Sequence, residues 1–236
     1  MTLRPQRTLS IIVPVLDEAA VIAAVLTALG PLRQRGAEVI VADGGSRDGT
    51  PELARPLADH VIAAARGRAS QMNAGAMAAR GDVLLFLHAD TRLPAQADDL
   101  VLDGLHSTGR QWGRFNVHIE GRNPMLAVIA ALMNWRSRIT GIATGDQAVF
   151  VTRQAFAAAG GFPDIPLMED IALSKRLKRL GRPLCLAAAV TTSGRRWERH
   201  GVIRTVLLMW RLRLAYFLGA EPAVLARRYG YVSRNG

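Results

Sequence analysis

Short apolar runs alternate with helix-like segments along the first ninety residues of the chain. A continuous apolar run suits a strand that is buried on both faces, and helical crossovers between such strands imply a parallel sheet. The predicted strands are 9–15, 38–42, 61–64 and 83–87. The predicted helices are 18–29, 50–58 and 70–79. This order is typical of half of a nucleotide-binding α/β domain.

The second half of the chain has a less regular pattern. Residues 112–119 and 148–151 predict strands, while 123–138 and 171–180 predict helices. Gly181 follows the second of these helices, at a position where helices commonly end. A last apolar run, 202–218, is interrupted by three arginines, which places positive charge beside a large hydrophobic face. These arginines are Arg204, Arg211 and Arg213.

The composition indicates a globular chain with a strong positive charge. Half of the 236 residues are hydrophobic, and the formal net charge is +11, carried almost entirely by arginine. The single cysteine, Cys185, excludes a disulfide framework within the chain and a multi-cysteine zinc site, and fits a reducing cytoplasm. The uncharged stretches, among them 123–135, are all shorter than the roughly 20 residues that span a bilayer, so no transmembrane helix is expected.

Polar and acidic residues gather in four islands, three of which sit where a predicted strand ends. In open α/β sheets, ligands collect outside the carboxyl ends of the strands. Carboxylates gathered there repel one another unless a cation or hydrogen-bond donors accompany them, so a ligand site is the simplest explanation. The islands are 14–18, 43–50, 88–90, and a composite of 145–147, 160–162 and 168–170.

The third island holds two potential metal ligands, His88 and Asp90. They are separated only by Ala89, so in extended chain their side chains point to the same side. The alternative for so short a motif is a strand that ends in a solvated turn.

In this order, the islands resemble those of the family-2 glycosyltransferases, inverting enzymes of the GT-A fold that use nucleotide-diphosphate sugars. The resemblance covers roughly residues 9–200 and implies an α/β fold, with a Rossmann-like nucleotide-binding half and a mixed central sheet flanked by helices. It divides the chain into a glycosyltransferase domain and a basic amphipathic helical tail. The domain is 1–200, with a nucleotide-sugar half at 9–92 and an acceptor half at 110–200, and the tail is 201–236.

The resemblance implies a nucleotide-sugar site that draws on the first three islands and on the segment 68–75, which resembles the part of the family that passes the nucleotide sugar. Asp43 matches an acidic residue that hydrogen-bonds the nucleotide base, commonly uracil, so a UDP-sugar is the expected donor. The residues of the expected site are Pro14, Asp17, Glu18, Asp43, Gly45, Arg68, Gln71, Asn73, His88, Ala89 and Asp90.

The metal motif departs from the family, which usually has Asp-x-Asp where this chain has His88-Ala89-Asp90. Asp90 is expected to bind Mn²⁺ or Mg²⁺, with diphosphate oxygens in other positions. His88 either adds a nitrogen ligand, which Mn²⁺ tolerates better than Mg²⁺, or only hydrogen-bonds phosphate or backbone. His200 is a second candidate ligand, with a surface position as its alternative.

Glu169-Asp170 resembles the Glu-Asp pair of the family, in which the residue matching Asp170 is the usual general base. Such a base makes the acceptor hydroxyl nucleophilic as it attacks the anomeric carbon, and no covalent partner is needed. The alternative is structural, because acidic residues just before Ile171 also stabilise the amino end of a helix.

Acceptor binding is expected from the loop Gly145-Asp146-Gln147 and from Trp197. Trp197 ends a segment similar to the Gln-x-x-Arg-Trp motif of processive members, but Ser193 stands in place of the glutamine, so polymer synthesis is not expected. Within the family, the chain most resembles a small bacterial subgroup associated with arsenosugar biosynthesis. Carotenoid-acid and other lipid-linked acceptors are the runner-up.

The tail suggests a second partner. From Arg195 onward there are nine arginines and two glutamates, so this segment holds +7 of the total charge. An interfacial helix on anionic lipid is one interpretation, and packing on the catalytic domain is the other. The apolar residues concerned are Val202, Val206, Met209, Trp210, Leu214 and Phe217.

Two other functional classes compete with the transferase. A nucleic-acid-binding protein would show the same positive charge, but no recognised nucleic-acid motif organises the few aromatic residues, so no nucleic-acid partner is expected. A nucleotidyltransferase or a noncatalytic nucleotide-sugar binder on the same fold is the closer rival.

Overall fold

The computed structural model describes residues 8–230, apart from the side chains of Arg196 and His200. The strands in this part of the chain are β1 (Leu9–Val15), β2 (Glu38–Asp43), β3 (His60–Ala63), β4 (Val83–Phe86), β5 (Thr91–Arg92), β6 (Trp112–Glu120), β7 (Phe150–Thr152) and β8 (Leu184–Ser193). The helices are α1 (Ala19–Gln34), α2 (Thr50–Ala54), α3 (Arg68–Ala78), α4 (Ala97–Thr108), α5 (Met125–Thr140), α6 (Arg153–Ala158), α7 (Glu169–Leu180), α8 (Arg195–His200), α9 (Val202–Phe217) and α10 (Pro222–Tyr229), with a 3₁₀ helix η1 at Gly145–Gln147.

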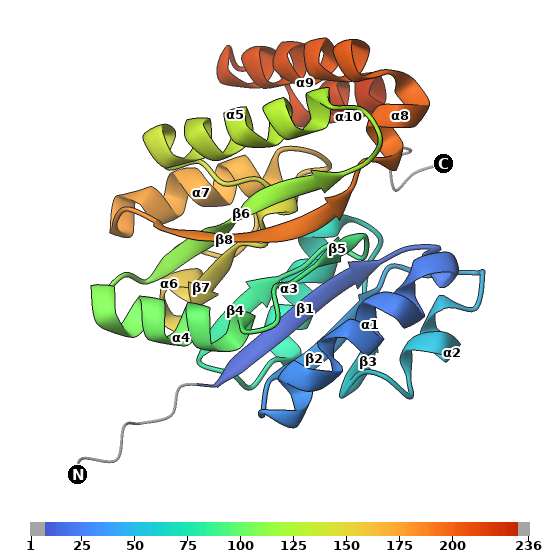
Figure 1. Ribbon diagram of the computed structural model, residues 1–236, viewed down its shortest axis with the longest axis vertical. Helices are drawn as coiled ribbons and strands as arrows, with labels where there is room; N and C mark the ends of the chain where they lie inside the picture. Colours follow the sequence, from blue (N-terminus) through green and yellow to red (C-terminus); the bar gives the residue numbers. More distant parts are fainter. Residues whose placement is uncertain (1–7, 231–236) are drawn as a thin grey trace.

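The strands form a mixed sheet in the order β3-β2-β1-β4-β7-β6-β8-β5, with helices on both faces (Figure 1). The first four strands in this order are parallel, and β7 joins β4 in the antiparallel sense. β6 is antiparallel to β7 and parallel to β8. The prediction of an α/β fold with a mixed central sheet is therefore confirmed.

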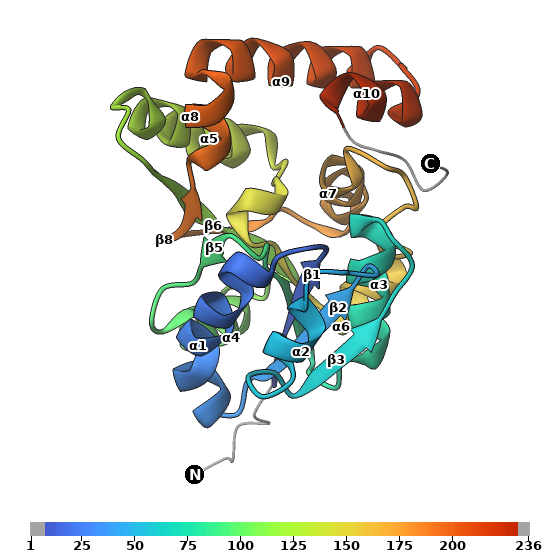
Figure 2. The ribbon, with the colours of Figure 1, turned by 90° about the vertical axis from the view of Figure 1, so that its right-hand side faces the viewer.

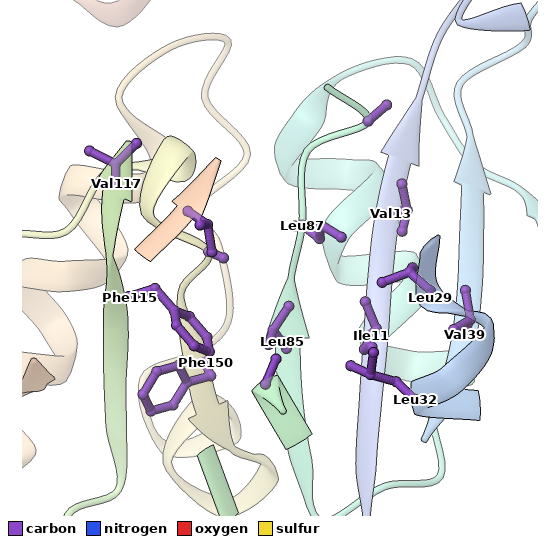
Figure 3. Packing of buried hydrophobic residues seen from close by; sticks show 14 of the residues in the cluster. Ile11, Val13, Leu29, Leu32, Val39, Leu85, Leu87, Phe115, Val117 and Phe150 are labelled. Carbon is purple, nitrogen blue, oxygen red and sulfur yellow. The ribbon is translucent and has the colours of Figure 1, made fainter. Parts of the chain in front are cut away.

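The apolar runs are buried on both faces of the sheet, as continuous apolar strands require. Ile11 and Val13 of β1 lie in one core cluster together with residues of α1, while Ile12 between them lies in a second cluster with residues of α3. Figure 3 shows the first cluster, in which Leu29 and Leu32 of α1 lie beside β1 and β2. Because side chains alternate along a strand, one apolar run supplies residues to the core clusters on both faces of the sheet.

Two of the predicted helices have different ends in the structure. α1 continues to Gln34, past the predicted end at residue 29 and through Pro31, because Leu32 is anchored in the core. α2 ends at Ala54 instead of residue 58, since residues 55–58 form turns that lead into β3.

The C-terminal helices α9 and α10 pack on the rest of the chain rather than extending away from it (Figure 2). Leu212 of α9 and Leu225 of α10 share a buried cluster with Ile171 of α7. The apolar residues predicted to form one interfacial stripe divide between two faces. Val202, Val206 and Met209 turn inward or lie half-buried, whereas Trp210, Leu214 and Phe217 are exposed. None of the described helices has the length and apolarity that crossing a membrane requires.

The close approach of α3 to β1 predicts a large effect of one methyl group. A Cβ on Gly75 would overlap Cγ2 of Ile12 beneath the helix, so Gly75→Ala should lower the free energy of unfolding by about 1–3 kcal/mol, although alanine favours helix. Urea denaturation measures this. In an Ile12→Ala background the overlapping methyl is absent, and the added cost of Gly75→Ala should fall below about 1 kcal/mol. Equal costs in both backgrounds would contradict the proposed overlap.

Candidate active site

The site begins where β1 and β4 lie side by side with their carboxyl ends at the same edge. The chain leaves β1 toward β2 on one side, whereas β4 lies on the other side, so the strand order reverses at this point. Such a switch point leaves a crevice in which α/β proteins bind ligands. Glu18 follows β1, and His88 and Asp90 follow β4, so the first and third islands meet in this crevice.

Hydrogen bonds tie the turn after β1 to the turn after β2. The backbone N–H groups of Asp17 and Glu18 donate to Ser46 Oγ and Thr50 Oγ1, each over 2.8 Å. In return, the Asp17 carboxylate accepts from the N–H of Arg47 over 2.8 Å. Asp17 adopts a left-handed backbone conformation with φ of 55° and is exposed. The Asp17 carboxylate therefore fixes the loop that presents Glu18.

Asp43 shapes its own turn. Its carboxylate accepts from the N–H groups of Gly45 and Ser46 and from the Ser46 hydroxyl. Gly45 has φ of 93°, a conformation that glycine adopts without strain, and is exposed at the rim. Asp43 is buried, and the contact with a nucleotide base stays a prediction.

Gln71 and Asn73 hold α3 against the rest of the site. Gln71 is buried, and its Nε2 donates to the carbonyl oxygens of Val15 and Ala42, over 2.6 and 2.9 Å, at the ends of β1 and β2. Asn73 exchanges two hydrogen bonds with the backbone of Phe162, over 2.8 and 3.0 Å. Both amides thus position the loops around the crevice. Direct contact with the nucleotide sugar stays a prediction for each.

Two adjoining cavities share the residues at the end of β4. The smaller, of about 210 Å³, lies against Pro14, Glu18, Gln71 and Ala89. The larger, of about 490 Å³, lies against Gly145, Asp146, Glu169, Asp170 and Trp197. Arg68, His88 and Asp90 line both cavities. The structure therefore brings most of the sequence-predicted site residues onto one continuous pocket. Asp17, Asp43, Gly45, Asn73 and Gln147 do not line it.

The carboxylates of Glu18 and Asp90 approach one another at this junction. Burial, and after it the negative charge of Asp90, raises the pKa of Glu18 above its usual range. Asp90 itself is exposed, with its carboxylate available to solvent. No group of three or more metal-ligating side chains occurs among the described residues. An exposed carboxylate can bind a cation whose other ligands are water or diphosphate oxygens, and this role of Asp90 stays a prediction.

His88 faces the acceptor loop. Its Nδ1 lies 3.6 Å from Oδ1 of Asp146, and a methyl group at Gly145 would overlap its ring. Burial raises the pKa of Asp146, but the neighbouring His88, together with Arg68 and Arg213, outweighs this and holds the pKa below its usual range. His88 thus contacts the Asp146 side chain, a partner that the sequence did not predict, and its role as a metal ligand or as a donor to phosphate or backbone stays a prediction. The side chain of His200, the other candidate ligand, lies outside the described part of the structure.

The Glu169-Asp170 pair opens α7 at the floor of the larger cavity. Asp170 Oδ2 accepts from the N–H of Gly145 over 2.9 Å, and Oδ1 accepts from the N–H of Ile171 over 2.7 Å. Glu169 is only 6% exposed. Burial, followed by the charge of Asp170, raises the pKa of Glu169 to about 7. The two neighbours therefore differ: Glu169 holds a proton in acid and near-neutral solution, while Asp170 is fixed by two backbone amides.

Gln147 holds the predicted acceptor loop, residues 145–147, together and does not line the pocket. It is fully buried, and its Oε1 accepts from the N–H of Thr144 over 3.2 Å while its Nε2 donates to Asn134 over 3.3 Å. Trp197 lines the larger cavity as expected.

Sequence reasoning missed several residues that line the larger cavity. They come from β8, α8, α9 and α10, and include Thr192, Arg199, Met209, Arg213 and Tyr229. The arginines that interrupt the apolar run 202–218 were a visible signal. Their pattern did not reveal that Arg213 alone among them lines this pocket.

The raised pKa of Glu169 predicts a pH-dependent stability. Between the ordinary value of 4.5 and about 7, the folded chain binds one proton more than the unfolded chain, so its stability falls as the pH rises through this window. From pH 5 to pH 8 the free energy of unfolding should fall by about 2 kcal/mol more in the wild type than in Glu169→Gln. Urea denaturation at both values measures this, with the exposed Glu221→Gln as control. Parallel pH profiles for wild type and Glu169→Gln would contradict the burial effect.

Solved structures with a similar fold include a mannosyltransferase and a glucosyl-3-phosphoglycerate synthase. S. aureus TarS, residues 1–349, has a TM-score of 0.66 at 17% identity, over 79% of this chain and 60% of its own. The mannosyltransferase PcManGT from Pyrobaculum calidifontis, solved with GDP-Man and Mn²⁺, has a TM-score of 0.62 at 20% identity, over 98% of this chain and 70% of its own. Glucosyl-3-phosphoglycerate synthase from Mycobacterium tuberculosis was solved with Mn²⁺, UDP and glucosyl-3-phosphoglycerate. It has a TM-score of 0.56 at 21% identity, over 79% of this chain and 71% of its own.

At these identities the likeness shows the GT-A fold alone. The chain spans about three fifths of the TarS 1–349 structure, and no curated protein matches it. The model of glycosyl transferase family 2 matches residues 10–151, which run from β1 through the first two residues of β7. This match covers more than half of the chain, and the protein belongs to glycosyl transferase family 2.

Proposed function

We propose that the protein transfers a sugar from a nucleotide-diphosphate sugar to an acceptor hydroxyl, with inversion at the anomeric carbon. One observation carries the proposal: Asp90 at the donor end and the Glu169-Asp170 pair at the other end line a single cavity. A leaving diphosphate and an attacking hydroxyl would then meet within one pocket. Transfer with inversion requires this opposition of a leaving-group site and a base.

The donor is a UDP-sugar in this proposal. Arg68 lies against both cavities, and Arg195 lies against the larger one, so their guanidinium groups suit the diphosphate oxygens. Both arginines also lower the pKa of Glu18, against the raising effects of burial and of Asp90. Asp43 and the turn after β2 would receive the base. Asp90 would hold Mn²⁺ or Mg²⁺, which when bound neutralises charge on the leaving diphosphate.

Asp170 is the general base in this proposal, and Glu169 is its neighbour without that role. Burial and the charge of Asp170 raise the pKa of Glu169 to about 7, so this carboxyl group is only partly ionised near neutrality, and we assign the base to Asp170. The amides of Gly145 and Ile171 hold the Asp170 carboxylate in one orientation. A proton taken from the acceptor by Asp170 leaves with solvent after transfer.

The acceptor side of the pocket combines apolar and positive groups. Leu167 and Met209 supply apolar wall, and Arg199 and Arg213 supply positive charge. The resemblance to the subgroup associated with arsenosugar biosynthesis makes a small acceptor of that pathway the first candidate. A carotenoid-acid or other lipid-like acceptor with an anionic group is the second, and the mixed lining of the pocket is compatible with either.

The first test separates an enzyme from a noncatalytic binder or a nucleotidyltransferase. Asp170→Asn should lower the turnover of transfer or of donor hydrolysis by about 10²–10⁴, because general-base assistance is lost. Binding of UDP with Mn²⁺, followed by thermal shift, should be unchanged. Asp99→Asn, an exposed change on α4, is the matched control. Unchanged turnover in Asp170→Asn would remove the base assignment, and release of a nucleoside monophosphate-linked product would favour the nucleotidyltransferase.

The second test concerns the metal. Asp90→Asn should raise the Mn²⁺ concentration needed for half of the UDP-induced thermal shift by about 10- to 100-fold. His88→Gln should leave that concentration unchanged, because His88 faces Asp146 and Gly145. If His88→Gln raised this Mn²⁺ concentration as much as Asp90→Asn does, His88 would be a metal ligand instead. Absence of any metal-dependent shift with every nucleotide would count against the donor site as a whole.

A further inference from the structure

α5 exposes a stripe of large apolar side chains to solvent. Their spacing of three and four residues keeps them within an arc of about 80° at 100° per residue. The other side of the helix packs on the sheet through Leu126, Ile129 and Ala130. The exposed residues are Met125, Val128, Leu132, Trp135 and Ile139. The stripe is therefore additional to the face that the fold uses for its core.

α9 carries a second stripe with the same spacing. Its inner side packs through Val202, Thr205 and Leu212, and its outer side presents large apolar residues within another arc of about 80°. The exposed residues are Ile203, Leu207, Trp210, Leu214 and Phe217. Trp210 is 64% exposed, as is Trp135 on α5.

The two stripes lie on neighbouring helices, and we name their ten residues together the α5–α9 face. Val202 and partly buried Val206 of α9 pack in the same cluster as Leu126 and Ile129 of α5. Figures 1 and 2 both place α9 directly above α5 at the same end of the molecule. Large apolar side chains gathered on the exposed sides of two neighbouring helices are typical of an interaction site.

Charge decides which partner fits this face. Arg204 and Arg211 are exposed and lie one above the other along the edge of the α9 stripe. The segment from Arg195 onward holds nine arginines against two glutamates. A second copy of the chain on this face would bring like charges together, which opposes association. Anionic lipid headgroups complement the arginines, while tryptophan side chains favour the boundary between headgroups and acyl chains.

We propose that the α5–α9 face docks the protein on the surface of an anionic lipid bilayer. Trp135 and Trp210 enter the boundary region, and Arg204 and Arg211 pair with headgroup phosphates. Docking is independent of the transfer chemistry, because no residue of the face lines the catalytic pocket. The inner side of α9 does line it, through Met209 and Arg213, so docking would hold the acceptor side of the pocket close to lipid.

Flotation of the full chain with vesicles tests the proposal. The protein should float with phosphatidylcholine vesicles that contain phosphatidylglycerol, and much less with phosphatidylcholine alone. Trp135→Ser with Trp210→Ser should lower the partition coefficient at least tenfold. Arg204→Gln with Arg211→Gln should lower the partition coefficient about fivefold for each arginine. Added salt should likewise lower the partition coefficient of the wild type. Tryptophan emission should shift to the blue in the wild type on binding.

The matched control is Met77→Ser, which removes an 86% exposed apolar side chain from α3, far from this face in the sequence. Circular dichroism verifies that each variant folds, and UDP binding verifies that the donor site is intact. Failure of the wild type to float with anionic vesicles overturns the proposal, as does flotation that the tryptophan variants leave unchanged. A dimer that these variants convert to a monomer, without vesicle binding, would assign the face to a second copy instead.

Discussion

The parallel pairing of β1 with β4 is the constraint on which the pocket depends. The register joins Ile12 to Phe86, the last residue of β4, and β1 continues to Val15, so the loops that follow the two strands enter one crevice from the same edge of the sheet. Gln71 adds a buried amide that donates to the carbonyl oxygens of Val15, the last residue of β1, and of Ala42, the residue before the end of β2. A buried amide group that is left without a hydrogen-bond acceptor costs more free energy than one hydrogen bond contributes. This arrangement therefore resists local rearrangement. The donor end of the site is consequently built on the most buried part of the sheet.

The acceptor end depends on a different kind of connection. β7 joins β4 in the antiparallel sense and brings η1 to the carboxyl end of β4, where Gly145 meets His88. The hydrogen bond from Gly145 to Asp170 then fixes the start of α7 against the same loop. The end of β4, η1 and the start of α7, which are distant in the sequence, thus meet through single contacts at Gly145. The outer wall of the pocket comes from α9 and α10, which pack on the chain through the small third cluster and, at Val202, through the first cluster.

The sequence predicted the strands and helices of residues 9–92 well because their signals are local. Continuous apolar strands, the turn at Asp43 and the motif ending at Asp90 each lie within ten residues. It did not predict β8, whose run of alanines carries a weak strand signal, nor α4, although Ala97, Val101 and Leu105 recur at helical spacing and are buried. The outer wall of the pocket, including Arg213, depends on how α9 packs, and no local pattern encodes that packing.

The contact between His88 and Gly145 has a consequence for the evolution of the family motif. The imidazole occupies the volume that a side chain at position 145 would need. An aspartate at position 88, as in the usual Asp-x-Asp, is shorter and would leave that volume free. Related chains that keep histidine at this position should therefore also keep glycine at the other, whereas chains with aspartate should accept larger residues there. The departure from the usual metal motif and the glycine of the acceptor loop form one coupled pair of positions.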